Sequence, residues 1–249
     1  AGVVISRDPL TDHVPLQSGG EGTALTQYPM DALEAVGLLK MDFLGLRTLS
    51  IIERTLAWIR KLYGQTVDFR RVRDDDPKTY EMLARGETTG VFQLESAGMR
   101  RVLRDLKPTV FEDLVSVLAL YRPGPMEFIP QYIAGKHGRI KVTYPHPSLE
   151  PILADTYGII VYQEQIMQIA SKMAGFSLGE ADLLRRAVSK KKRETLDRER
   201  EHFVAGSVKQ GYTEEEANAV YDMIVRFADY GFPRAHAVAY AVLPFQTAY

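Results

Sequence analysis

Helix start signals constrain the fold of this chain more than any other feature of its sequence. Three capping boxes, each a Ser or Thr with Glu three residues later, occur at Thr109–Glu112, Ser177–Glu180 and Thr213–Glu216. Asp76 followed by Pro77 is typical of a first helical turn, and Gly86 is placed to end that helix. The region from about residue 50 onward is therefore predicted to be mostly helical.

Two further helices in this region follow from apolar spacing. The string YQEQIMQIASKMAG places Ile166, Ile169, Ala170 and Met173 on one helical face, which we expect to point inward. The helix that begins near Thr109 should end at YRPGP, because its prolines cannot continue a helix.

The first 64 residues have a different pattern. AGVVIS predicts a short buried strand, followed by a polar loop around Gly19 and Gly20, and residues 38–44 predict a second strand. Beyond Gly45 the apolar residues recur at helical spacing as far as Gly64, a residue suited to ending a helix. The expected fold class is mainly α, with a small α/β piece at the N-terminus.

Composition narrows the class of protein. The 249 residues suit one or two domains, and the hydrophobic share of 45% is that of a globular protein. The chain has no cysteine and five scattered histidines, so disulfides are excluded and a structural zinc site is not expected; this fits a reducing cytoplasm. No apolar stretch approaches the roughly 20 residues of a membrane span. The start without methionine and the end within an apolar run favour a piece of a longer protein.

Lys40 and Asp42 interrupt the apolar run GLLKMDFLGL, and strand alternation puts them on the same face. A buried carboxylate is costly unless it is paired or binds a metal, and this one lies near a strand end, where ligand sites of α/β folds occur. Alternatively, the two are neighbours on a solvated edge, or Asp42 hydrogen-bonds the turn at Gly45. One carboxylate does not make a two-metal site.

A dense group of cations lies in ADLLRRAVSKKKRE, where the packing face is expected to consist of Leu183, Leu184, Ala187 and Val188. The cations are Arg185, Arg186, Lys190, Lys191, Lys192 and Arg193. Such density suits a polyanion, because guanidinium groups bind phosphate bidentately and lysines act as point charges. The alternative is a solvated face, since Glu194, Asp197, Glu199 and Glu201 offset much of the charge.

Two other strings carry candidate binding residues. In GMRRVLRDLK an apolar face of Met99, Leu103 and Leu106 opposes a basic stripe of Arg100, Arg104 and Lys107, which either lies along a phosphate backbone or is solvated surface. In GFPRAHAVAYA, Arg234, His236 and Tyr240 open an apolar helix, with the last two on one face. No phosphate-cradling glycine motif, HExxH motif or nucleophile elbow is present, which disfavours common hydrolases and nucleoside-triphosphatases.

The strings GLLKMDFLGLRTLSII, GVFQLESAGMR, LYRPGPM, YGIIVYQEQIMQIA, ADLLRRAVSKKK and GFPRAHAVAYAVLPFQTAY, in this order, closely resemble the alpha-subunit family of bacterial DNA polymerase III, the replicative C-family polymerases. The resemblance covers essentially the whole chain. It implies the end of a polymerase-beta-like palm domain over residues 1–50 and a truncated fingers domain over residues 51–249.

The resemblance also implies roles for the candidate residues. Asp42 matches the last of three palm aspartates that bind two Mg²⁺ ions, and Lys40 looks like an active-site cation. Binding of dNTP and template-primer DNA is implied for Arg185, Arg186, Arg234, His236 and, less directly, for Lys190, Lys191, Lys192, Tyr240, Arg100 and Arg104.

The chain departs from the family pattern because the upstream PDxDxD-like motif with the other two aspartates is absent from its sequence. We therefore expect it not to polymerise by itself. The family's sliding-clamp and other replisome partners bind regions that this chain does not contain, and its location is the bacterial cytoplasm. Three alternatives stay open: an error-prone C-family polymerase, a non-catalytic nucleotide- or nucleic-acid-binding module, and a purely structural helical domain.

Overall fold

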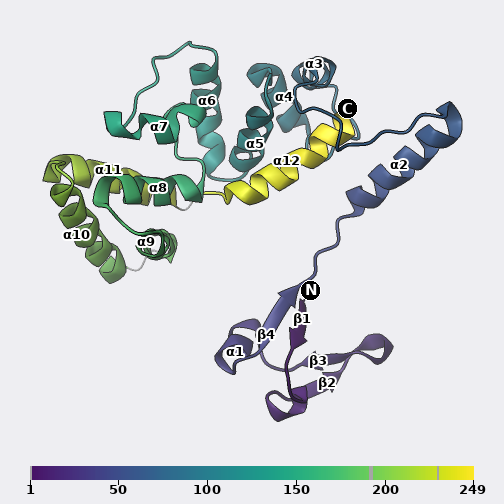
Figure 1. The fold of residues 1–249 in the computed structure, drawn as a ribbon, viewed down its shortest axis with the longest axis horizontal. Coiled ribbons are helices and arrows are strands. Elements are labelled where there is room, and N and C mark those ends of the chain that lie inside the picture. The colour runs from purple at the N-terminus through teal and green to yellow at the C-terminus, as the bar shows by residue number, and fades with distance from the viewer. Residues whose placement is uncertain (1, 191–192, 229) are drawn as a thin grey trace. The chain divides into compact units, whose positions relative to one another are not determined.

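The structure, a computed structural model, describes residues 2–190, 193–228 and 230–249. The chain divides into two compact units, residues 1–66 and 67–249. The first contains the small sheets and the second is built from helices, so the expected class, mainly α with a small α/β piece, is confirmed (Figure 1). The assignment of palm to residues 1–50 and fingers to 51–249 stays a prediction.

The first unit has two antiparallel strand pairs. Strand β1 (Gly2–Ile5) pairs with β4 (Leu39–Asp42), and β2 (Leu16–Ser18) pairs with β3 (Ala24–Thr26). Helix α1 (Met30–Ala35) contributes Leu33 to a small core. The polar loop expected around Gly19 is in fact the tip of the β2–β3 hairpin, which sequence reasoning missed because its strands are only three residues long.

Helix α2 (Arg47–Tyr63) confirms the change of period after Gly45, and Gly64 ends it in the left-handed conformation with φ of 67°. None of its residues is buried. The apolar face that the spacing indicated is therefore not buried by the described residues of the first unit.

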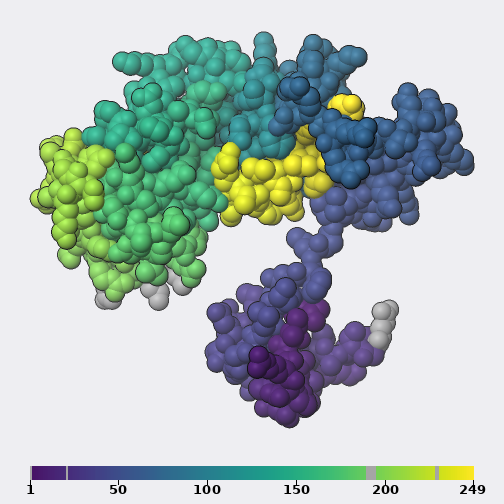
Figure 2. Space-filling view, viewed as in Figure 1, coloured from purple at the N-terminus to yellow at the C-terminus, as the bar shows by residue number. Residues whose placement is uncertain are grey.

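The second unit contains the remaining helices and a few short 3-10 turns (Figures 1 and 2). The α-helices are α3 (Pro77–Arg85), α4 (Ala97–Leu106), α5 (Phe111–Leu120), α6 (Ile129–Lys136), α7 (Glu150–Leu153), α8 (Gln163–Ala174), α9 (Leu178–Lys190), α10 (Arg193–Lys209), α11 (Glu214–Ala228) and α12 (Arg234–Ala248). Helix α12 packs against α5 and α3, and Figure 2 shows it at the surface of the unit. No helix among the described residues is long and apolar enough to cross a membrane.

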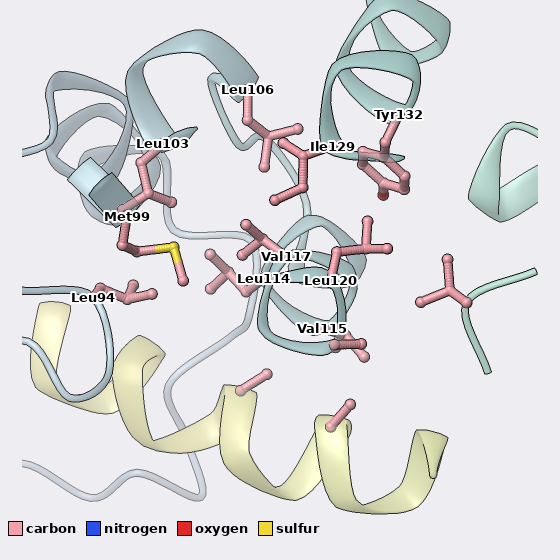
Figure 3. Close-up of a cluster of buried hydrophobic side chains, with 14 of the residues drawn as sticks. Leu94, Met99, Leu103, Leu106, Leu114, Val115, Val117, Leu120, Ile129 and Tyr132 are labelled. Atoms are coloured by element: carbon pink, nitrogen blue, oxygen red, sulfur yellow. The ribbon is translucent and has the colours of Figure 1, made fainter. Parts of the chain in front are cut away.

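Two hydrophobic clusters hold the second unit together. One joins α3, α4, α5, α6 and α12; its central side chains include Leu103, Leu106, Leu114 and Ile129, which converge between the helices in Figure 3. The other joins α7, α8, α9, α10 and α11 around Phe203 and Tyr221. Burial of Ile166, Ile169, Ala170 and Met173 confirms the inward face expected for α8.

Two of the three capping boxes are confirmed. The Ser177 and Thr213 hydroxyls accept hydrogen bonds from the backbone N–H of Glu180 and Glu216, whose carboxylates accept from the N–H of the two capping residues. The third was wrong by one position. Helix α5 begins at Phe111, and the carboxylate of Asp113 accepts from the N–H of Thr109 and Val110 at 2.8 and 3.2 Å. Asp113 is also buried against Lys136, which decides between the adjacent acids.

Candidate functional site

Three helices meet at the N-terminus of α8. Tyr162 forms a parallel bridge with Phe232, two residues before α12. The N–H of Gln163 donates to the Phe232 carbonyl at 3.0 Å, and its side-chain amide donates to the Gly231 carbonyl at 3.2 Å. The start of α12 is thereby fixed to the start of α8, although about 70 residues separate them in the sequence.

Arg185 of α9 reaches the same place. Its guanidinium donates to the Asp182 carboxylate at 2.9 Å and to the side-chain oxygen of Gln163 at 3.2 Å. Arg186 pairs with the other oxygen of Asp182 at 2.8 Å. The Arg185 side chain is 23% exposed and that of Arg186 is 63% exposed, so the second is the more accessible cation.

Arg234 connects α12 to two other helices. Its backbone N–H donates to the Glu164 carboxylate of α8, with the nearer oxygen at 2.9 Å, which satisfies a free donor of the first helical turn. Its guanidinium donates to Glu112 of α5 at 2.8 Å. The side chain is half-exposed, so its cationic group is open to solvent on one side.

His236 and Tyr240 form an aromatic stack on α12. Their ring centroids are 4.3 Å apart, which confirms that they share a helical face. Phe232 contacts His236 edge-on at 5.3 Å, and Phe92 contacts Tyr240 at 5.7 Å. Such a row of rings provides flat surfaces along one face of α12.

Arg122 of the YRPGP turn supports the segment that leads into α12. Its guanidinium donates to the Tyr230 carbonyl and lies 4.6 Å from the Phe232 ring centroid. Gly124 has φ of 102°, and the Tyr230 ring fills the space that a side chain would need there. Sequence reasoning read this turn only as a helix end.

The arginine–aspartate contacts predict an acid-sensitive junction. The hydrogen bond from Arg185, together with the charges of Arg185 and Arg186, lowers the pKa of Asp182. A lowered carboxyl pKa contributes stability above the unfolded value of about 4, and this stability is lost as the pH falls through the folded pKa. Urea unfolding from pH 6 down to pH 3 should therefore show a smaller loss of stability in Asp182→Asn than in the wild type. An identical pH profile for both proteins would contradict this.

The other basic candidates are placed apart from this junction or are not described. Arg100 donates to the Thr89 hydroxyl at 2.9 Å, and Arg104 lies over Gly86. Arg100 is half-buried and Arg104 exposed, so the two do not form the uniform solvated stripe that their spacing indicated. Lys190 is the last residue of α9, and Lys191 and Lys192 lie outside the described residues.

Lys40 and Asp42 lie in the first unit and form an ion pair along β4, as strand alternation predicted. Of the alternatives left open for this pair, the structure has the solvated one, because the Asp42 side chain is 73% exposed and the apolar neighbours Leu39, Met41 and Phe43 are exposed as well. The Lys40 side chain lies across Gly2 of β1, and its hydrogen bond lowers the pKa of Asp42. The geometry is that of a solvated pair at a sheet edge.

A pair of Mg²⁺ ions needs several carboxylates to hold it. Within the described ranges no group of three or more His, Asp or Glu side chains could hold a metal ion. Asp42 offers one suitable oxygen ligand, but the donor set present does not fit a two-metal centre.

Comparison with known proteins shows the family of this chain. The sequence model of the bacterial DNA polymerase III alpha subunit finger domain matches residues 48–211, and that of the alpha NTPase domain matches residues 1–45. The chain belongs to the bacterial DNA polymerase III alpha subunit family. The resemblance read from its motifs is thus confirmed.

Relatives in this family match along the whole chain. DNA polymerase III subunit alpha of Bacillus subtilis is 64% identical over 249 residues, and that of Halalkalibacterium halodurans is 61% identical over 249 residues. The Thermus aquaticus subunit is 56% identical over 254 aligned positions. In each case the match covers all of this chain but only 21–22% of the relative, so the chain is similar to one segment of a much longer polymerase subunit.

Sequence reasoning missed the residues that assemble the junction. Gln163 and Glu164 were seen only as part of a helix, Glu112 only as a capping-box acid, and Asp182 was not singled out. These residues nevertheless hold Arg185, Arg186 and Arg234 in place. The available signal was the run of polar residues directly after the apolar GIIVY, at a predicted helix start.

Proposed function

We propose that the chain is part of a replicative DNA-directed DNA polymerase, in which the α8–α9–α12 junction binds the triphosphate of an incoming dNTP beside template-primer DNA. The observation that carries the proposal is that Gln163 and Glu164 bring Arg185 of α9 and the start of α12 to one place. Arg185, Arg186 and Arg234 supply cations, and His236 with Tyr240 supplies flat rings.

The pairing of these arginines bears on how a triphosphate would bind. Asp182 and Glu112 neutralise the cations in this structure, so phosphate oxygens must replace carboxylate oxygens. The exchange keeps the number of charge-assisted hydrogen bonds on guanidinium groups that are already oriented, and it requires the freed Asp182 and Glu112 carboxylates to turn toward solvent, away from the phosphates. Lys190, Lys191 and Lys192 continue the basic sequence after these arginines and are proposed to add charge for the same polyanion.

Catalysis is assigned to the longer polymerase, and we infer that this chain alone does not extend a primer. Asp42 is proposed as one ligand of a Mg²⁺ pair, whose other protein ligands are not among these 249 residues, and Lys40 as a neighbouring cation that orients it. Nucleotidyl transfer in the bacterial cytoplasm, with clamp and replisome partners, belongs to this proposal for the longer protein.

The proposal predicts nucleotide binding that depends on the α9 arginines. Fluorescent dNTP with Mg²⁺, titrated into the chain at low and moderate salt, should bind at least about a hundredfold more weakly to Arg185→Ala/Arg186→Ala, since each of the two charge-assisted contacts contributes about 1.5–3 kcal/mol. The single variant Arg186→Ala, at an exposed position, should show part of the loss without risk to the fold.

The matched control is Arg198→Ala/Lys209→Ala on α10, which removes the same charge from exposed positions. It should bind dNTP as the wild type does. Circular dichroism reports whether each variant is folded. A folded wild-type chain that binds no dNTP at either salt concentration would contradict the proposal and leave the chain a structural piece of the polymerase.

A further inference from the structure

A second basic feature lies away from the α8 junction, in a groove between α4 and α6. Its volume is about 500 Å³, and its rim carries the cations Arg101, Arg104, Lys107 and Arg139. Asp105 is the single carboxylate among the lining residues. The groove therefore has a strong excess of positive charge, while the whole chain has a net charge of -1.

These cations differ from those of the junction in their partners. Arg185, Arg186 and Arg234 are each paired with a carboxylate. Over the described ranges no ion pair or side-chain hydrogen bond joins any of the four rim cations to a protein group. Their charge is thus available to an external anion without an exchange of partners.

Buried side chains beneath the groove pack its two helices together. Leu103 and Leu106 of α4 and Ile129 of α6 pack into one cluster, and Figure 3 shows Leu106 and Ile129 facing each other. Lys107 then ends α4 in the left-handed conformation, with φ of 48°, directly before Pro108. Arg101 lies two residues before Leu103 on α4, and Arg139 follows the C-terminus of α6, so the two cations come from both sides of this packed pair.

The residues that line the groove indicate which kind of ligand it binds. Ile129 and Ile133 are buried, while Met126 and Pro130 are exposed and Val102 is partly exposed, so a peptide side chain would find only small apolar patches between the cations. No aromatic ring lines the groove, so unpaired bases have nothing to stack on. A row of exposed cations over a covered apolar floor suits repeated phosphates without base contacts.

We propose that the α4–α6 groove binds the phosphodiester backbone of DNA, separately from the triphosphate site at the α8 junction. The ligand class rests on the proposed polymerase function, whereas the groove's charge and geometry do not. Contacts of this kind are independent of base sequence and weaken steeply with salt, because each releases condensed counterions.

The experiment measures binding of a fluorescein-labelled 20-base-pair duplex, and of one of its strands, to the chain over a range of salt concentrations. In Arg101→Ala/Arg139→Ala, duplex affinity should fall about tenfold and the slope of log K against log salt should be shallower by about 2, since each lost phosphate contact removes about 0.9. Both positions are exposed, so the variant should fold normally.

The control is Arg70→Ala/Arg73→Ala, which removes the same charge from exposed arginines that Asp68 and Asp75 already neutralise. It should keep the wild-type affinity and slope. If the loss in Arg101→Ala/Arg139→Ala appears with the single strand alone, the groove belongs to an unpaired strand. Unchanged DNA affinity and slope in that variant would overturn the proposal and favour an acidic protein segment as the occupant.

Nucleotide binding separates this inference from the proposed function. Arg101→Ala/Arg139→Ala should bind dNTP with Mg²⁺ as the wild type does, because its residues lie outside the α8 junction. If Arg101→Ala/Arg139→Ala leaves the salt slope of DNA binding unchanged while the wild type binds dNTP, the groove alone is refuted. If the wild type binds no dNTP while that variant makes the salt slope shallower, the triphosphate site alone is refuted.

Discussion

Leu184→Ala should lower the free energy of unfolding by about 2–5 kcal/mol, because it removes a fully buried side chain and leaves a cavity. Leu184 of α9 packs in the cluster that joins α7 to α11, next to the arginines of the proposed triphosphate site. Chemical denaturation followed by circular dichroism measures the change. If α9 shifts into the cavity, the Leu184→Ala variant should also bind dNTP more weakly.

The neighbouring residue provides the control. Leu183 was expected to share the packing face of α9, but its side chain is 61% exposed, so that expectation was wrong. Leu183→Ala is the same chemical change one position away and should alter stability by about 0.5 kcal/mol or less. Equal losses in the two variants would contradict the placement of α9.

Asp113→Ala should destabilise the second unit by about 3–5 kcal/mol, because it strands the ammonium group of Lys136 in a buried position. The two groups are 2.7 Å apart, and both are almost fully enclosed. Asp113 also accepts the backbone hydrogen bonds of Thr109 and Val110, so the start of α5 should fray. Thermal and urea unfolding report the loss.

A double variant separates the two causes. Asp113→Ala/Lys136→Met removes both charges and should recover most of the stability, leaving a deficit of about 1 kcal/mol from the lost helix cap. Lys136→Met alone leaves the carboxylate capped but unpaired and should be less harmful than Asp113→Ala. No recovery in the double variant would mean that the unpaired Lys136 charge is not the main cause of the lost stability.

Local chemistry explains which parts of the fold could be predicted. The boxes at Ser177 and Thr213 were correct because the acid three residues later lies at the surface and has no buried partner that shifts the helix start. At Thr109 two acids follow in succession, and burial of Asp113 against Lys136, a residue of another helix, decides between them. Local spacing contains no information about that contact.

The candidate site also has features that local spacing predicts and features that it does not. The shared faces of Lys40 with Asp42 and of His236 with Tyr240 follow from strand and helix periodicity, and both are confirmed. The exposure of Asp42 and the contact of Gln163 with Arg185 depend on which elements pack together. Periodicity orients a side chain on its own element but does not say what lies opposite.

Gln163 links two segments of the junction through one side chain. One end of its amide accepts from Arg185 and the other donates to the carbonyl of Gly231, so a single side chain spans α9 and the segment before α12. If a phosphate binds Arg185 as proposed, the Gln163 amide loses one of its two side-chain partners and keeps the other. The proposed triphosphate site and the segment that leads into α12 therefore share one side chain.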